Sequence, residues 1–451
     1  MSLLERRISH ASLIGFAWPT ILSYVFVNIY FIIDGIFVSQ ALGTSALAAV
    51  NIVMPVFGVT LAIATMIGTG GSALVASLIG EGKLREARGG FSLLVLFCLI
   101  SSGILCVLGL LWQEPLLRLL GAEAGVYELC RAYLQPLLIA TPLILAGMVL
   151  DNFFVVEGRP RFSMCSVILG GTVNVLLDYL FLFVWGMGIE GAALATSIGY
   201  SLSVLIGFGY FGLWRKGTLR LVSPVKNWQI VTKSMSNGMS EIVVMLAGSV
   251  IIIVMNRTLM ELVGEDGVAA ASIIQYTEEL LAAVYLGYAE GIAPLMSYRQ
   301  GTGEWKEVRR IYECSLHIIS VFAAATFLTS FLIAGPLIAA FAGNVSAVYE
   351  MAVHGFHIFA VSFLFMGFNT YSSSLFTALN DGRTSALLSG WHSICFLICL
   401  LLLPRGLGLN GVWIAQPVAE LLALLMAINC FKQRGFLNGP SRKNSRGIRT
   451  A

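Results

Sequence analysis

The stretch Gly80-Glu81-Gly82-Lys83-Leu84-Arg85-Glu86-Ala87-Arg88 reappears 221 residues later as Gly301-Thr302-Gly303-Glu304-Trp305-Lys306-Glu307-Val308-Arg309. Two further pairs of segments match in the same order along the chain: 42–52 with 263–273, and 186–195 with 406–415. Segments that recur in order at a nearly fixed spacing are typical of a duplicated fold. The sequence therefore predicts two halves of similar structure.

The residues around these matches are strongly apolar. Of the 451 residues, 57% are hydrophobic and 11% are charged, and the mean hydropathy is +0.86. Soluble domains carry roughly 25% charged residues, so a soluble globular chain is excluded. Apolar stretches of about 20 residues, enough to cross a bilayer as a helix, recur along the chain and are too long for the strands of a membrane barrel. We expect twelve spanning helices, at residues 13–39, 46–79, 90–112, 127–156, 162–185, 190–214, 234–263, 267–299, 310–342, 347–378, 384–404 and 410–431.

The expected fold is an all-α polytopic membrane protein with twelve transmembrane helices in two six-helix lobes. Because each half holds an even number of spans, both halves enter the membrane in the same direction. This predicts a parallel repeat, with a pseudo-twofold axis along the membrane normal. The expected divisions are an N-terminal lobe at 1–214, a cytoplasmic linker at 215–233, a C-terminal lobe at 234–431 and a basic cytoplasmic tail at 432–451.

The distribution of charge predicts the orientation. Most of the 27 basic residues fall in segments that twelve helices would place on one side of the membrane. Cytoplasmic loops carry an excess of Lys and Arg, so we expect both termini in the cytoplasm. A basic run beside a membrane helix favours contact with anionic membrane lipids over nucleic acid, and no nucleic-acid partner is expected.

Polar side chains within the spans indicate a functional site in the N-terminal half. Asp34 lies in the first span, Asn174 and Asp178 share a face of the fifth, and Thr196 lies in the sixth. At about 1.5 Å per residue these groups reach nearly one depth in the outer half of the membrane. They predict an oxygen-rich cation site or a proton-sharing pair, although hydrogen bonds between helices are the alternative for Asn174 and Thr196. The counterpart of Asp34 in the second half is Met255, so the shared fold does not require this acid.

The C-terminal half contains a different set of polar side chains at membrane depth. They form a possible cavity for a cationic substrate, or pair with Arg257 and with one another. The set comprises Glu241, Gln275, Tyr276, Glu278, Glu279, Glu290, Asn369, Gln416 and Glu420. No His or Cys cluster has zinc spacing, so we expect no cofactor and no metal, other than a possible Na⁺ at Asp34, Asn174, Asp178 and Thr196.

The sequence favours three other functions less. A flippase for a lipid-linked saccharide needs a basic central cavity, and few basic residues lie within the spans, with Arg257 the main candidate. A membrane enzyme is not expected, because the sequence has no HExxH and no GxSxG motif. A channel would be indicated by an ion current that needs no gradient of a second solute.

Several of these stretches resemble the multidrug and toxic compound extrusion (MATE) transporters. The resemblance rests on Pro19 with Asp34, on 174–178 and on 188–196. The segments 237–241, 290–298 and 411–420 are similar to those of the MepA-like branch.

The resemblance implies a secondary active multidrug efflux transporter that alternates between outward-open and inward-open states. Lipophilic, often cationic compounds would leave in exchange for inward Na⁺ or H⁺, across a bacterial cytoplasmic (inner) membrane. Asp34, Asn174, Asp178 and Thr196 would hold the coupling cation, and Pro19 would let the first helix bend. Some relatives use an acid in the middle of the seventh helix, but 243–249 has no carboxylate here. Since two lobes complete a transport unit, a monomer is expected.

Overall fold

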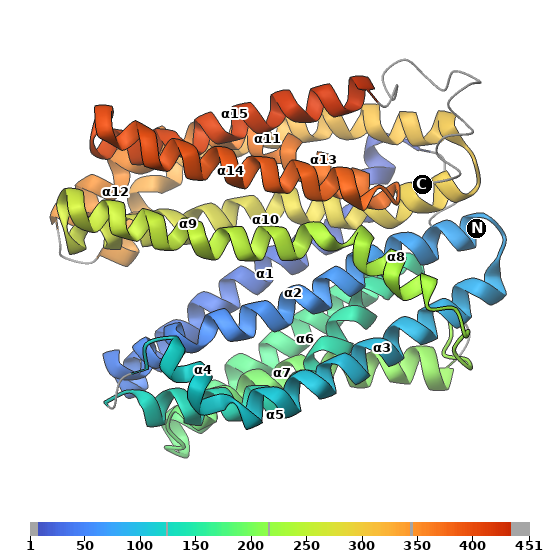
Figure 1. Ribbon diagram of the computed structural model, residues 1–451, viewed down its shortest axis with the longest axis horizontal. Helices are drawn as coiled ribbons and strands as arrows, with labels where there is room; N and C mark the ends of the chain where they lie inside the picture. The colour runs from blue at the N-terminus through green and yellow to red at the C-terminus, as the bar shows by residue number, and fades with distance from the viewer. Residues whose placement is uncertain (1–7, 123–124, 215–216, 343–345, 434–451) are drawn as a thin grey trace.

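The computed structural model describes residues 8–122, 125–214, 217–342 and 346–433, and almost all of them are helical (Figure 1). The first half contains α1 His10–Leu42, α2 Thr44–Gly80, α3 Leu84–Leu111, α4 Gln113–Leu119, α5 Tyr127–Val156, α6 Pro160–Tyr179 and α7 Ile189–Phe208. The second contains α8 Gln229–Asn237, α9 Met239–Val263, α10 Glu265–Gly301, α11 Trp305–Ala342, α12 Ser346–Phe359, α13 Phe363–Ala378, α14 Gly382–Leu407 and α15 Leu409–Gln433. Wide π-helical turns, η2 Leu180–Val184 and η3 Gly209–Trp214, extend α6 and α7.

Within the described residues, twelve segments are long and apolar enough to cross a membrane, and they confirm the predicted spans. The predicted basic tail lies outside the described residues from 434 onward, as do Arg215 and Lys216 at the start of the predicted linker. The short helix α4 between the third and fourth spans was not predicted.

The turns between paired spans repeat in the two halves. Gly43 alone separates α1 from α2, and its counterpart Gly264 alone separates α9 from α10. Their φ angles are 80° and 77°, values that favour glycine because it has no Cβ. A glycine with positive φ at equivalent positions of the two halves confirms the duplication read from the sequence.

Two predicted spans are interrupted. The span expected at 234–263 begins instead at Met239, because α8 ends at Asn237 and Gly238 separates it from α9. A Cβ at Gly238 would lie 2.1 Å from the carbonyl oxygen of Met66, so α2 crosses the chain at the break. The span at 347–378 likewise divides into α12, a 3-10 turn and α13.

The apolar core follows the division into halves, except at the start of α1. The largest buried cluster lies in the first half and reaches as far as Ile230 and Val231 of α8. Leu13, Phe16 and Ala17 of α1 instead belong to a cluster built by the second half. The first helix therefore packs against both groups of helices.

The two halves meet where α2 and α10 cross. A Cβ at Gly80 would lie 2.2 Å from the carbonyl oxygen of Tyr298, and one at Gly301 would lie 2.1 Å from that of Ser77. These contacts are reciprocal, since Tyr298 and Gly301 stand 221 residues after Ser77 and Gly80. From this end the two groups of helices spread apart toward the end that carries α4 (Figure 1). The halves are thus in contact at the end that the charge pattern predicts to be cytoplasmic.

Candidate functional site

The four residues predicted in the first half come together at one depth. Asp34, Asp178 and Thr196 lie six to eight residues from the span ends that the charge pattern predicts to be outer, or about 9–12 Å. Asn174 lies one turn deeper on the same face of α6 as Asp178. All four are buried, and Asp178 is fully inaccessible.

The two carboxyl groups are neighbours without a donor between them. Asp34 of α1 and Asp178 of α6 lie within side-chain contact. The Nδ2 of Asn174 donates to the Oγ1 of Thr196 at 3.4 Å. Among the described residues, Oδ1 of Asp34 and both carboxyl oxygens of Asp178 lack a hydrogen-bond donor. Two buried carboxyl groups in this position need a cation or a shared proton, because both cannot stay ionised at low cost.

Three tyrosines surround this pair, and the sequence reasoning did not select them. Tyr30 and Tyr200 interact with each other and lie beside Asp34, and Tyr133 faces both Asp34 and Asp178. One signal was available: Tyr30 precedes Asp34 by four residues and so shares its helix face. Phenolic hydroxyls can donate to a carboxylate or accept from a bound cation's water.

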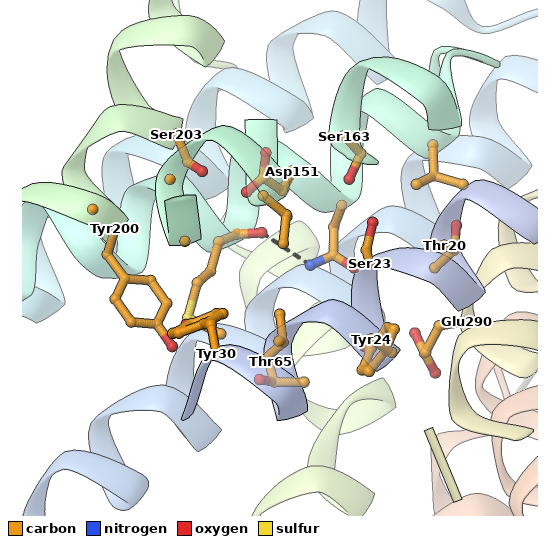
Figure 2. A pocket seen from close by; sticks show the side chains of 18 of the residues that line it. Thr20, Ser23, Tyr24, Tyr30, Thr65, Asp151, Ser163, Tyr200, Ser203 and Glu290 are labelled. Carbon is orange, nitrogen blue, oxygen red and sulfur yellow. Dashed lines mark hydrogen bonds between the residues drawn. The ribbon is translucent and has the colours of Figure 1, made fainter. Parts of the chain in front are cut away.

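A cavity of about 210 Å³ lies beside this region and is lined by Asn174, Tyr30 and Tyr200 among others (Figure 2). Its walls come from α1, α2, α5, α6 and α7, with Glu290 and Pro294 contributed by α10. In the close view Tyr30 and Tyr200 lie on one side and Glu290 on the other, with Asp151 between them along the wall. No Lys or Arg is among the lining residues of the part of the chain described. The walls are mostly apolar, carry the two acids Asp151 and Glu290, and come from both halves of the chain.

Asp151 is a further acid that the sequence reasoning missed. It lies in α5, six residues before Glu157 ends that helix, and its Oδ1 is buried without a donor in the described structure. Asp151, like Asp34, is an ionisable group within an apolar span, where it is costly and therefore a functional candidate.

The acids predicted in the second half do not form one site. Glu290 lines the cavity and accepts a hydrogen bond from Ser374 at 3.1 Å. Glu241 of α9 and Tyr24 of α1 are its electrostatic neighbours, so this group joins both halves. Glu279 precedes Glu290 by three helical turns and so shares its face of α10.

The other predicted residues lie elsewhere. Tyr276 is exposed on α10. It shares the helix face of Gly287, a residue that contacts α1. Gln275 is half-buried. A separate group lies inside the second half: Glu278, Asn369, Gln416 and Glu420, together with His392, which was not predicted. His392 could have been selected from the sequence, because it is an imidazole within an apolar span.

Pro19 lies within α1, which continues on both sides of it. The hydroxyl of Ser23 donates to the carbonyl oxygen of Pro19 at 2.9 Å. A proline inside a helix removes one backbone hydrogen bond and weakens the helix at that turn. The weakened turn lies within the part of α1 that packs on α10, where Ala17 and Ile21 contact Gly291 and Gly287, and Asp34 lies further along the helix.

Twelve spans in a duplicated arrangement define a membrane transporter, with Asp151 and Glu290 lining an internal cavity and the pair Asp34 and Asp178 buried beside it. The chain belongs to the MatE family, whose model matches residues 19–180 and 241–401. This membership confirms the predicted resemblance and the prediction that the protein is not an enzyme.

Relatives and solved structures agree over nearly the whole chain. The chain is 23% identical to the multidrug export protein MepA of Staphylococcus saprophyticus and 21% identical to that of Staphylococcus aureus MRSA252, with 94% of both chains covered in each case. The outward-facing structure of a multidrug resistance MATE family transporter is 22% identical and covers 96% of this chain and 97% of its own, with a TM-score of 0.90. A MOP superfamily transporter from Pyrococcus furiosus also reaches 0.90, at 22% identity, with 96% and 98% covered. The predicted fold is confirmed.

Proposed function

We propose that this protein exports lipophilic, cationic organic compounds in exchange for Na⁺ or H⁺ by alternating access. It would work as a monomer in a bacterial cytoplasmic membrane, with both termini in the cytoplasm and lobes at 1–214 and 234–431 joined through 215–233. The observation that carries the proposal is the contact between Asp34 and Asp178, in which Oδ1 of Asp34 and both oxygens of Asp178 lack protein donors in the described structure. The names of the MepA relatives support export of drugs.

The coupling we propose runs through α1. A cation that enters from outside would bind between Asp34 and Asp178, with Asn174 and Thr196 as neutral oxygen ligands. Without the cation the two carboxylates repel, so its loss would favour a different position of α1. Because the start of α1 packs on the second half, a bend at Pro19 would carry that change to the contact between the lobes.

The proposed substrate region lies where Tyr24, Glu241 and Glu290 meet, with Tyr276 and Glu279 on the adjoining faces of α10. Carboxylates and an aromatic ring attract an organic cation. The cavity that Glu290 lines has no Lys or Arg among its described residues, and so it does not suit the pyrophosphate of a lipid-linked saccharide. This supports drug export over the flippase.

The test uses purified protein in liposomes loaded with a fluorescent lipophilic cation. A Na⁺ gradient and a pH gradient are imposed separately, and Asp178→Asn is measured beside the wild type. Efflux that follows one gradient and is lost in the variant is expected, and it names the coupling ion. Equal efflux with and without both gradients, from folded wild-type protein, would contradict the proposal.

A further inference from the structure

The C-terminal half encloses a carboxylate far from the outer acid pair. Glu420 of α15 lies eleven residues from the outer end of its span, near the middle of the membrane, and its side chain is 4% exposed. The Nδ2 of Asn369 donates to its Oε2 at 2.5 Å, and the Nε2 of Gln416 donates to its Oε1 at 3.3 Å. Two neutral amides from α13 and α15 therefore hold the carboxylate in place.

The only basic group in contact with Glu420 in the described chain is His392 of α14. Its Nε2 lies 3.3 Å from Oε1 of Glu420, at ion-pair distance but without a hydrogen bond in the described structure, and its ring is 27% exposed. The described ion pairs of Lys and Arg involve other carboxylates. The imidazole thus stands between a buried carboxylate and the outside of the lobe.

The other groups facing this pair add negative charge or none. Glu278 and Tyr285 of α10 are electrostatic neighbours of Glu420, and α13 contributes the neutral Asn369. On α12, His354 bonds to Asn410 near the outer end. Two carboxyl groups without Lys or Arg at membrane depth need a compensating positive charge.

A second observation points to a bound cation. Gln416 is 6% exposed, and its Oε1 has no donor in the described structure, although its amide group lies against Glu420. The Oδ1 of Asn369 is buried and lacks a donor in the same way. The described residues include no cluster of three or more metal-ligating side chains. An imidazole 3.3 Å from a carboxylate suits a proton better than Na⁺, which prefers oxygen ligands.

The duplication relates Glu420 to a residue of the first half. At the offset of 220 that relates 186–195 to 406–415, Glu420 corresponds to Tyr200. Tyr200 lies beside Asp34 in the first half. The second half therefore carries an acid where the first half places a neighbour of its cation site.

We infer that Glu420 and His392 form a proton-binding pair, a second cation site that loads independently of Asp34 and Asp178. One proton enters at the imidazole and is shared with the carboxylate, so that the pair changes from a net charge of −1 to zero. Glu278 remains beside it as a source of negative potential. The role in coupling rests on the proposed function, but binding of the proton does not.

The test is infrared difference spectroscopy of the purified full chain during a pH titration, reading the C=O band of protonated carboxyl groups. Glu420→Gln should lose one component of that band. His392→Gln should keep it with a midpoint roughly one pH unit higher, because the imidazolium that holds the neighbouring carboxylate ionised is gone. His354→Gln, a histidine near the outer end of the same lobe, is the matched control and should titrate like the wild type.

Three results would overturn the inference: an unchanged band in Glu420→Gln, an unchanged midpoint in His392→Gln, or removal of the Glu420 component by Na⁺ at constant pH. Should Glu420→Gln fail to fold, the His392→Gln midpoint decides the question. The measurement needs no transport, so failure of the exporter proposal would leave these readings intact. Asp34→Asn should retain the Glu420 component.

Discussion

The reciprocal glycine contacts where α2 crosses α10 predict that a single methyl group changes the balance between conformations. In Gly80→Ala the new Cβ would lie 2.2 Å from the carbonyl oxygen of Tyr298, and in Gly301→Ala it would lie 2.1 Å from that of Ser77. Ordinary contact begins above 3 Å, so the helices must separate by about 1 Å. The obstacle is backbone and cannot rotate away.

The size of the effect follows from the cost of overpacking. Inserting a methyl into such a contact costs about 1–3 kcal/mol, and only the state in which α2 and α10 are in contact at this end is affected. The ratio of the state with these ends apart to the state with them in contact should therefore rise by about 5- to 150-fold. The gain in helix propensity on replacing glycine by alanine applies to both states and cancels.

The assay is distance measurement by pulsed electron resonance between spin labels at Arg85 and Lys306, exposed equivalent positions just beyond the crossing. Both alanine variants should increase the long-distance population. Gly103→Ala in α3, where a Cβ meets nothing within 4 Å, is the control. Identical distance distributions in the wild type and both variants would refute the reasoning.

Three further substitutions test separate parts of the account. Pro19→Ala restores an N–H that can donate to the carbonyl of Gly15 and should slow efflux several-fold while leaving cation binding unchanged; equal efflux would remove the proposed hinge. Glu157→Ala loses hydrogen bonds from the backbone N–H groups of Thr218 and Leu219, at 2.6 and 2.7 Å, and should destabilise the protein by about 2 kcal/mol, read as a lower unfolding temperature. Glu290→Gln should weaken binding of a cationic dye on the order of tenfold but not that of a neutral analogue; equal losses would indicate a structural role.

The sequence predicts the helices and the depth of the outer site well, for physical reasons. A membrane demands long apolar spans, and a helix rises by a fixed amount per residue. Counting from the span ends was therefore enough to bring Asp34, Asp178 and Thr196 to one level. The role of Asp34, Asn174, Asp178 and Thr196 in coupling stays a prediction.

The features that depend on helix rotation and on contacts distant in sequence were not predictable. The break at Gly238 arises because Met66 of α2 crosses there, and no local pattern carries that information. The acids of the second half divide because Glu290 and Glu278 point to different sides of α10. Pairing of His392 with Glu420 requires the relative rotation of α14 and α15, which apolar composition alone does not determine.

The central claim is that Asp34 and Asp178 together hold the ion that is exchanged for drug. The most direct test reverses the cycle: a drug gradient is imposed across proteoliposomes, without any ion gradient, and the counter-movement of Na⁺ or H⁺ is recorded. The account predicts ion movement opposite to the drug in the wild type, and its loss in both Asp34→Asn and Asp178→Asn although drug still binds. Undiminished ion movement in either variant would contradict it.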